Sequence, residues 1–328
     1  MNHKVICAGH ICLDITPVFT NQMAVEAVED LLLPGSLTEV GAVDVHTGGS
    51  VANTGLAMSF LGNDVSLLGK IGDDAFGMII ERIVQQNGGS GLIVDSNGST
   101  SYSVVLAIPG IDRMFLHHPG ANDSFCSNDV PDTLLKDAEL LHFGYPPLMK
   151  RFYEKNGEEL IRLFTRCKEN DVLTSLDMAG VDPNSDAGRI DWISYLKNVL
   201  PLVDYFVPSI EEIAFMMQMK ETDKKAIADQ LLSWGAGTVL IKCGTEGIYY
   251  SNGSMEGMQP CYPVDHVASA TGAGDTSIAA FLTAQLEGLD LAKSASLAAM
   301  EGACCVTTYD ALSGLKTLPE LEVAIHAC

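Results

Sequence analysis

Basic residues are scarce in this chain. Among 328 residues, 19 Lys and Arg stand against 42 Asp and Glu, so the net charge is −23 with histidine counted as neutral. Nucleic acids and anionic membrane surfaces carry the same sign of charge and repel such a chain. The balance therefore argues against a nucleic-acid polymer or a membrane as the main partner, and it leaves small molecules and other proteins.

Long apolar runs and paired cysteines are also missing. No stretch approaches the roughly 18 to 20 apolar residues that a membrane span needs, and the apolar stretch at positions 5–8 is too short for the core of a signal peptide. The nine cysteines form no C-x-x-C pair and no zinc-finger spacing, which is typical of reduced thiols. We therefore expect a soluble, cytoplasmic protein.

Two common nucleotide-binding motifs are absent. No G-x-x-x-x-G-K-[ST] sequence occurs, and a dinucleotide fingerprint in the last third of the chain would need glycine where Ser277 stands. The first absence excludes a P-loop and the second argues against a dinucleotide-binding turn.

The chain does contain a regular alternation of element types. Apolar residues make up 47% and charged residues 19%, which is a globular balance. Short apolar runs alternate with segments of helical periodicity, and this predicts an α/β fold with a mostly parallel central sheet flanked by helices. The expected strands are 5–8, 65–68, 140–142, 173–176, 205–207 and 238–241, and the expected helices are 53–61, 75–87, 156–170, 209–217, 224–234 and 275–288.

Two segments, 12–47 and 98–120, interrupt this alternation. Each contains a run with the period of two that is typical of strands, at 37–45 and at 101–107. We expect the two segments to pair into a small β-sheet lid on a single α/β domain that spans 1–328. Ordinary surface hairpins are the alternative interpretation.

The most informative stretch is Ala268-Ser-Ala-Thr-Gly-Ala-Gly-Asp275, which runs directly into a helical pattern. Free backbone N–H groups at the start of a helix, together with the helix dipole, favour an anion. Asp275 would lie in the first helical turn, where a carboxylate could accept a proton from an attacking hydroxyl. A tight turn with Asp275 as a stabilising cap is the structural alternative.

Four motifs, in order along the chain, resemble the ribokinase-like (PfkB) carbohydrate kinase family over roughly residues 4–315. The glycine turn is similar to the C-terminal signature of the family, and Gly48-Gly-Ser-Val-Ala-Asn53 is similar to its N-terminal signature. Ser209-Ile-Glu-Glu212 resembles its N-x-x-E motif, and Lys242-Cys-Gly-Thr-Glu-Gly247 resembles its nucleotide-side glycine loop.

The resemblance implies a ribokinase-like core with a β lid, and the transfer of the γ-phosphate of ATP, with Mg²⁺, to a substrate hydroxyl. By match, Asp275 would be the base and the turn before it the anion hole. Arg113 or a neighbouring histidine would reach the substrate from the lid, although a solvated lid edge explains either histidine equally well. The implied residues are Asp275, Gly272, Ala273 and Gly274 for catalysis; Asp14, Gly49, Asn53, Arg113 and His118 for substrate; Lys242, Gly244, Gly247 and Thr271 for nucleotide; and Glu212 for the metal, through water.

Departures from the family pattern bear on the substrate. Ser50 follows Gly-Gly where ribokinases proper have lysine, and the acid that holds ribose at a strand end is replaced around Gly144 and Tyr145. These two changes argue against ribose itself. Ser209 replaces the asparagine of the N-x-x-E motif, so that contact is lost or supplied by a hydroxyl.

The expected function is an ATP-dependent kinase that acts on a small sugar or sugar-like substrate. A nucleoside kinase of the same fold is one alternative, and a non-catalytic sugar-sensing protein is the alternative from another class. A homodimer through the lid is expected as well, because an exposed sheet edge invites pairing.

Overall fold

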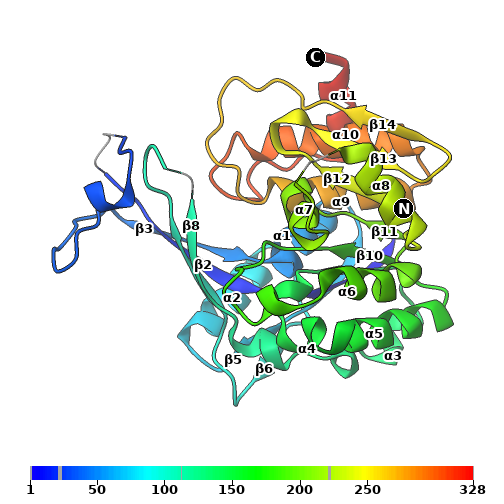
Figure 1. The fold of residues 1–328 in the computed structure, drawn as a ribbon, viewed down its shortest axis with the longest axis horizontal. Helices are drawn as coiled ribbons and strands as arrows, with labels where there is room; N and C mark the ends of the chain where they lie inside the picture. The colour runs from blue at the N-terminus through cyan, green and yellow to red at the C-terminus, as the bar shows by residue number, and fades with distance from the viewer. Residues whose placement is uncertain (1, 21–23, 112, 221–222, 328) are drawn as a thin grey trace.

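The computed structural model describes residues 2–20, 24–111, 113–220 and 223–327. Its centre is an eight-stranded sheet, parallel from β12 to β4 and antiparallel at the other edge (Figure 1). In spatial order the strands are β14 (Glu256–Gln259), β13 (Ile248–Ser251), β12 (Thr238–Lys242), β11 (Tyr205–Phe206), β10 (Leu173–Asp177), β9 (Leu140–Gly144), β1 (Lys4–Gly9) and β4 (Asp64–Leu68).

Both faces of the sheet are covered, so the strands at its centre are buried along almost their whole length. All five residues of β9 are buried, and so are the last five of β1. The predicted mostly parallel α/β class is confirmed, and each predicted core strand is present. The antiparallel strands β13 and β14 were not predicted.

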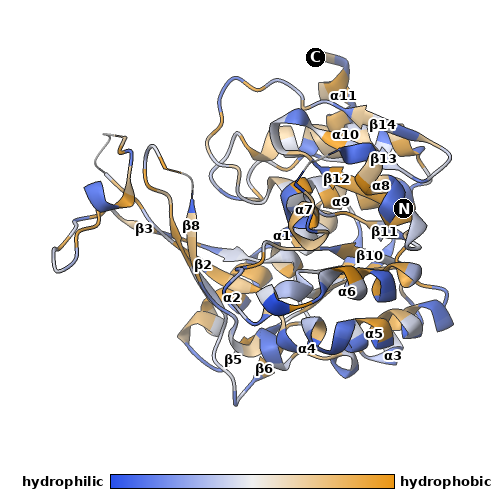
Figure 2. Cartoon of the chain, viewed as in Figure 1, coloured by the Kyte–Doolittle hydropathy of each residue, from blue (hydrophilic) through white to orange (hydrophobic). Residues whose placement is uncertain are grey.

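Helices cover both faces of the large sheet. Alternate residues of β1 point to opposite sides, so Val5 packs in the cluster that contains α1, α9 and α10, and Ile6 in the cluster that contains α5, α6 and α8. Figure 2 shows α9 and α10 as largely apolar, and most of their residues are buried. The α-helices are α1 (Ser50–Phe60), α2 (Ala75–Gln86), α3 (Asp132–Leu135), α4 (Lys150–Tyr153), α5 (Glu158–Glu169), α6 (Trp192–Val199), α7 (Ile210–Met216), α8 (Lys224–Ser233), α9 (Ala273–Leu286), α10 (Leu291–Cys305) and α11 (Leu318–Ala327).

Short 3-10 segments join several of these elements. They are η1 (Val28–Asp30), η2 (Gly120–Ser124), η3 (Ser127–Asp129), η4 (Pro146–Leu148), η5 (Glu154–Gly157), η6 (Ala187–Arg189), η7 (Leu200–Leu202) and η8 (Gly244–Glu246).

A separate four-stranded sheet projects from the body, as Figure 1 shows. It joins the two segments expected to pair, with β2 parallel to β7 at its centre. The run at 37–45 was predicted to form a strand. Only its last three residues do so, since β3 begins at Val43. In spatial order this lid contains β3 (Val43–Gly48), β2 (Cys12–Pro17), β7 (Tyr102–Leu106) and β8 (Met114–His118), and a two-stranded sheet of β5 (Lys70–Gly72) and β6 (Ile93–Asp95) lies apart from it.

None of the helices in the described part of the chain combines the length and the hydropathy needed to cross a bilayer. Seven of the described cysteines are free thiols: Cys7, Cys12, Cys126, Cys167, Cys243, Cys261 and Cys305. The cytoplasmic location stays a prediction.

Candidate active site

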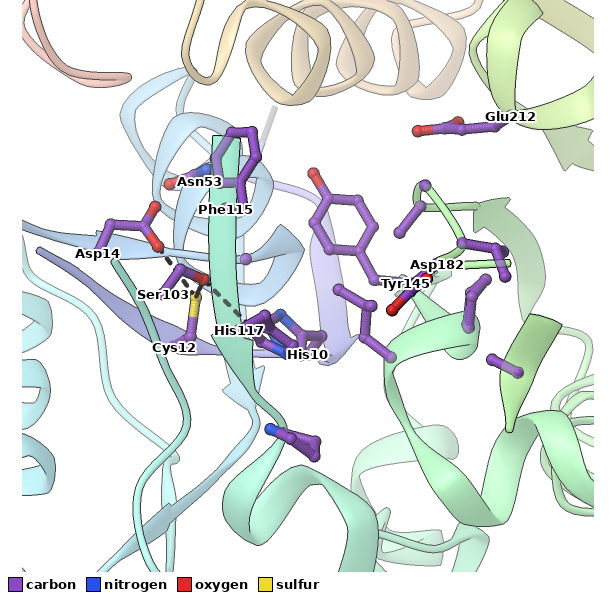
Figure 3. Close-up of a pocket in the computed structure, with 18 of the residues that line it drawn as sticks. His10, Cys12, Asp14, Asn53, Ser103, Phe115, His117, Tyr145, Asp182 and Glu212 are labelled. Atoms are coloured by element: carbon purple, nitrogen blue, oxygen red, sulfur yellow. Dashed lines mark hydrogen bonds between the residues drawn. The ribbon is translucent and has the colours of Figure 1, made fainter. Parts of the chain in front are cut away.

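A cavity of about 820 Å³ lies at the carboxyl ends of the parallel strands, under the lid. Its walls come from the loops after β1, β9 and β10, from the starts of α1 and α9, and from lid strands β2, β7 and β8 (Figure 3). This edge is where open α/β sheets bind their ligands. The fold thus brings residues from both halves of the sequence to one place.

Asp275 lies in the first turn of α9 and is 5% exposed. Three side chains donate hydrogen bonds to its carboxylate: Asn53 Nδ2 to Oδ2 at 3.0 Å, Thr54 Oγ1 to Oδ1 at 3.3 Å, and Tyr145 OH to Oδ1 at 2.7 Å. Asp275 was proposed from the sequence as a base and Asn53 as a substrate contact, so the two signatures meet although they are far apart in the chain. The contacts from Thr54 and Tyr145 were not foreseen.

The turn before Asp275 leaves the start of α9 without a side-chain cap. Gly272 is the N-cap residue, with φ 78° and no side-chain hydrogen bond to the helix. A Cβ at this position would lie 2.3 Å from the Cβ of Ala311, so only glycine fits. Gly272 and Thr271 line the cavity, and the backbone N–H groups of Ala273 and Gly274 follow in the first turn. The arrangement suits an anion.

Asp14, on lid strand β2, lines the cavity near the start of α1 (Figure 3). A Cβ at Gly48 would lie 2.2 Å from Asp14 Oδ2, so glycine is needed for this close approach. Burial raises the pKa of Asp14, while hydrogen bonds from Cys12 and Ser103 oppose the rise. Gly49 also lines the cavity. The sequence-predicted substrate residues Asp14, Gly49 and Asn53 are therefore brought together.

The lid histidines differ from the sequence-based expectation. His117 lines the cavity, whereas His118 is exposed, bonds Ser99 Oγ at 2.9 Å and lies outside the cavity. The cavity wall thus contains His117 rather than His118, the predicted substrate contact, because adjacent strand residues face opposite sides and the register of β8 on β7 turns His117 inward. The ring of His117 packs against that of His10, with the centroids 5.1 Å apart and the ring planes tilted by 53°.

The imidazoles of His117 and His10 favour the neutral form, and each has one ring nitrogen without a hydrogen-bond partner among the described residues. Burial, followed by the charge of His118, lowers the pKa of His117 to about 4, and burial lowers the pKa of His10 well below its usual range. His117 Nε2 and His10 Nδ1 are buried and have no hydrogen-bond partner among the described residues. His10 was not singled out from the sequence, since a lone histidine after a strand carries no motif.

Arg113 connects the lid to the α9 turn. Its guanidinium donates a hydrogen bond to Thr271 Oγ1, and both residues line the cavity. Arg113 was predicted as a lid contact and Thr271 as a nucleotide contact, so the structure places the two predicted groups side by side.

Lys242 forms an ion pair below the glycine turn. Its Nζ donates to Asp177 Oδ1 at 2.8 Å, and its Cδ is 3.4 Å from where a Cβ on Gly274 would stand. Burial opposes the ammonium charge, but the carboxylates of Asp177 and Glu212 outweigh it and raise the pKa of Lys242. Sequence motifs identified Lys242 but not Asp177.

Gly244 and Gly247, predicted nucleotide contacts, belong to the η8 turn between β12 and β13 and line neither this cavity nor the second one. A Cβ on Gly247 would lie 2.1 Å from the carbonyl oxygen of Gln259, so the packing of β13 on β14 already requires glycine there. Their nucleotide role stays a prediction.

Glu212 lines the cavity from the first turn of α7, with its carboxylate extending toward the cavity in Figure 3. Its Oε2 accepts from the backbone N–H of Ser209 at 2.8 Å, and Ser209 Oγ accepts from the N–H of Glu212 at 3.3 Å. Ser209 thus completes a capping box where the family pattern has asparagine. Within the described ranges no group of three or more His, Cys, Asp or Glu side chains could hold a metal ion.

A second cavity, of about 470 Å³, is formed by the loop at 263–266 and the end of α10, with residues 313–316 on its far side. The backbone N–H of Ala268 donates to the carbonyl oxygen of Val306 at 2.8 Å, which ties the start of the glycine turn to the end of α10. The second cavity and the α9 turn are therefore joined by one short segment of chain.

These features define a phosphotransferase-like site: a buried carboxylate at an uncapped helix start, beneath a lid. The sequence model of the pfkB family of carbohydrate kinases matches residues 4–318 of the chain. The chain therefore belongs to this family and is a sugar kinase. Fructokinase-2 of Oryza sativa subsp. japonica is 27% identical over 305 residues, which cover 86% of each chain. An uncharacterised sugar kinase of Archaeoglobus fulgidus is 26% identical over 265 residues, 79% of this chain and 98% of that one.

Solved structures share the whole fold. A fructokinase from Xylella fastidiosa, with bound ATP, superposes with a TM-score of 0.80 at 21% identity over 100% of this chain and 99% of its own. The ribokinase of Arabidopsis thaliana, complexed with ribose and ATP, gives 0.79 at 20% identity over 99% of both chains. The ribokinase-like fold predicted from the sequence is confirmed.

Proposed function

We propose that the chain transfers the γ-phosphate of ATP to a hydroxyl of a small, uncharged sugar, with Asp275 as the general base. The observation that carries the proposal is the position of Asp275, held at the uncapped start of α9 in the same cavity as Asp14. A carboxylate within reach of a bound hydroxyl can take its proton as the new bond to phosphorus forms.

Short polar groups on two sides of the cavity suit a polyol acceptor. Asp14 and Asn53 supply a carboxylate and an amide, and Gly49 exposes backbone. His117 adds from the lid an imidazole nitrogen, Nε2, that has no partner among the described residues, in the role first expected of His118. The acceptor would lie among these groups, with its reacting hydroxyl toward Asp275.

The nucleotide fits the opposite side of Asp275. The N–H groups of Gly272, Ala273 and Gly274 would form the anion hole, with Thr271 beside them, and the second cavity has room for the base of ATP. Mg²⁺ commonly binds through phosphates, waters and one or two carboxylates, which agrees with the lack of a three-ligand protein site among the described residues. Glu212 would hold it through water. Mg²⁺ would supply charge neutralisation of the phosphates. A candidate ribokinase II from Escherichia coli was solved with ATP and Mg²⁺.

The charge of the cavity indicates an uncharged acceptor. Five carboxylate residues line it, whereas Arg113 is the one Lys or Arg side chain among its described lining residues, and it already bonds Thr271. An acceptor carrying a phosphate or carboxylate would be repelled. The carboxylates are those of Asp14, Asp123, Asp182, Glu212 and Asp275.

A nucleoside is the second candidate acceptor. Phe115, Tyr145 and Tyr153 line the cavity along with the polar groups, and aromatic faces stack on nucleobases. The ribosyl hydroxyls would then take the place of the sugar. A panel of neutral hexoses, pentoses and nucleosides distinguishes the two.

The substitution Asp275→Asn tests the proposed base. It preserves size but removes proton affinity, and we expect acceptor-dependent ADP formation to fall about 10²- to 10⁴-fold while ATP binding persists. Asp229→Asn, on an exposed position of α8, is the matched control and should retain wild-type turnover. Near-normal turnover of the Asp275 variant would contradict the mechanism.

The lid homodimer and the single-domain organisation stay predictions. The lid exposes Val43, Phe115 and Leu116, at 55%, 57% and 60% of their surfaces, which gives a second lid an apolar surface to pair with. Light scattering on the purified protein would measure the oligomeric state directly.

A further inference from the structure

Tyr145 has a backbone conformation that its sequence disfavours. It follows β9 with φ 66° and ψ 44°, in the left-handed region, and it precedes Pro146. Non-glycine residues seldom adopt this region, and a residue before proline is normally extended. Such strain persists where the surroundings fix the residue, and it is common at functional sites.

Neighbouring contacts hold Tyr145 in this conformation. Its N–H donates to the carbonyl oxygen of Asp177 at 3.2 Å, and its carbonyl oxygen accepts from the N–H of Leu148 at 3.0 Å. Gly144, just before it, is so close to α1 that a Cβ would lie 1.8 Å from Ser50 Oγ. The strand end is thus clamped between α1 and β10, and the phenol is directed at Asp275.

The phenol is a dependable donor. Burial raises the pKa of Tyr145 well above its usual value, and the charges of Asp275 and Asp177 raise it further. The hydroxyl therefore keeps its proton, and it lies 2.7 Å from Asp275 Oδ1, the shortest of the three hydrogen bonds to that carboxylate.

The hydrogen bonds leave the two oxygens of Asp275 unequal. A carboxylate oxygen accepts about two hydrogen bonds. Oδ1 takes both Tyr145 and Thr54, whereas Oδ2 takes Asn53 alone among the described residues. One acceptor position remains, and it is on Oδ2.

We propose that Tyr145 is a positioning residue for the reaction: its phenol, with Thr54, saturates Asp275 Oδ1 and turns Oδ2 toward the acceptor hydroxyl. The inference rests on the proposed role of Asp275 as the base. In the step, the acceptor O–H bond breaks, its proton passes to Oδ2, and the acceptor oxygen forms the bond to phosphorus while the bond to the leaving phosphate breaks. Tyr145 gives up no proton.

The substitution Tyr145→Phe removes one oxygen atom and keeps the ring. We expect kcat to fall about 10- to 100-fold, the range that a hydrogen bond to a charged group can account for, with the KM of the acceptor changed less than about threefold. The matched control is Tyr195→Phe, which removes the hydroxyl of a buried tyrosine that has no partner within the described ranges. It should leave kcat unchanged.

The pH profile separates positioning from simple packing. The phenol donates to the ionised carboxylate, so without it the acid limb of kcat should move to higher pH. Tyr195→Phe should leave the limb in place. Several titratable groups surround Asp275 in both proteins and are left intact by the change: Cys7, Cys12, Asp14, Asp177, Glu212, Lys242 and Cys305.

Crystal structures provide a readout that needs no activity. In wild type we expect one orientation of the Asp275 carboxylate, and in Tyr145→Phe a rotated or doubled one. If wild type forms no ADP in response to any acceptor, the proposed function fails, while this comparison still tests the contact. An unchanged carboxylate with unchanged kcat and acid limb, or a change confined to KM, would overturn the role assigned to Tyr145.

Discussion

The ion pair of Lys242 and Asp177 offers a sharp test of the architecture beneath the site. The two side chains are 14% and 1% exposed, and their charged atoms are 2.8 Å apart. β11 ends at Phe206, so the ends of β10 and β12 can meet beyond it. Breaking a buried pair by removing one partner costs about 3–5 kcal/mol, because a charge is left uncompensated.

Lys242→Met should therefore lower the free energy of unfolding by about 3 kcal/mol above pH 8, where Asp177 is ionised in wild type. The destabilisation comes from Asp177, which would remain buried without its partner. Its Oδ2 already lacks a hydrogen-bond partner within the described ranges, and its Oδ1 would lose the ammonium group of Lys242 as a donor. Replacing both residues, as Lys242→Met with Asp177→Leu, should cost less than the sum of the single changes. Urea unfolding followed by circular dichroism measures all three variants, and Lys225→Met, at an exposed position of α8, is the control.

The free energy of unfolding of Lys242→Met, relative to wild type, should also depend on pH, and the direction of the change can be worked out. Burial raises the pKa of Asp177, and the charge of Lys242 opposes the rise. Without Lys242 this pKa should rise further, so the native variant holds the proton to a higher pH than native wild type. The unfolded state is the same in both proteins, so the stability of Lys242→Met relative to wild type should fall as pH rises above the wild-type value, about 8. Additive single effects below about 1 kcal/mol, with no such trend, would refute the reasoning.

Two further predictions concern binding. From Cys243 to Ala292 the chain has no Lys or Arg, and this span contains the proposed phosphate site. Removal of Mg²⁺ by EDTA should therefore weaken ATP binding at least tenfold, as measured by calorimetry. An unchanged affinity for ATP would contradict the placement of the phosphates in this span. His117→Ala should raise the KM of the acceptor about tenfold, which is the effect expected when one hydrogen bond is lost. His118→Ala should leave this KM unchanged, because His118 does not line the cavity. Because burial lowers the pKa of His117 to about 4, the wild-type KM should not change with its protonation between pH 6 and 8, and a KM that tracks a titration in that range would contradict a neutral imidazole.

The sequence was informative where a family motif marked the start of a helix. Gly48 to Asn53 and Thr271 to Asp275 both open helices whose first turns line the cavity, and the resemblance assigned both to one site, so their approach could be expected. The hydrogen bond from Asn53 to Asp275 is the outcome.

The remaining contacts depend on geometry that no local pattern encodes. Whether His117 or His118 faces inward is set by the register of β8, which pairs Ser103 with His117. The contact from Tyr145 to Asp275 depends on a left-handed backbone that the following proline disfavours. A polar residue at the end of a buried parallel strand was the available signal for Tyr145, as it was for Asp177.

The most direct test of the central claim is acceptor-dependent ADP formation by the purified protein with MgATP, across neutral sugars, nucleosides, sugar acids and sugar phosphates. The structure predicts that at least one uncharged acceptor stimulates ADP release and is recovered as its phosphate monoester, while the anionic acceptors do not. A rate of ATP breakdown that is the same with every acceptor as with none would contradict the account.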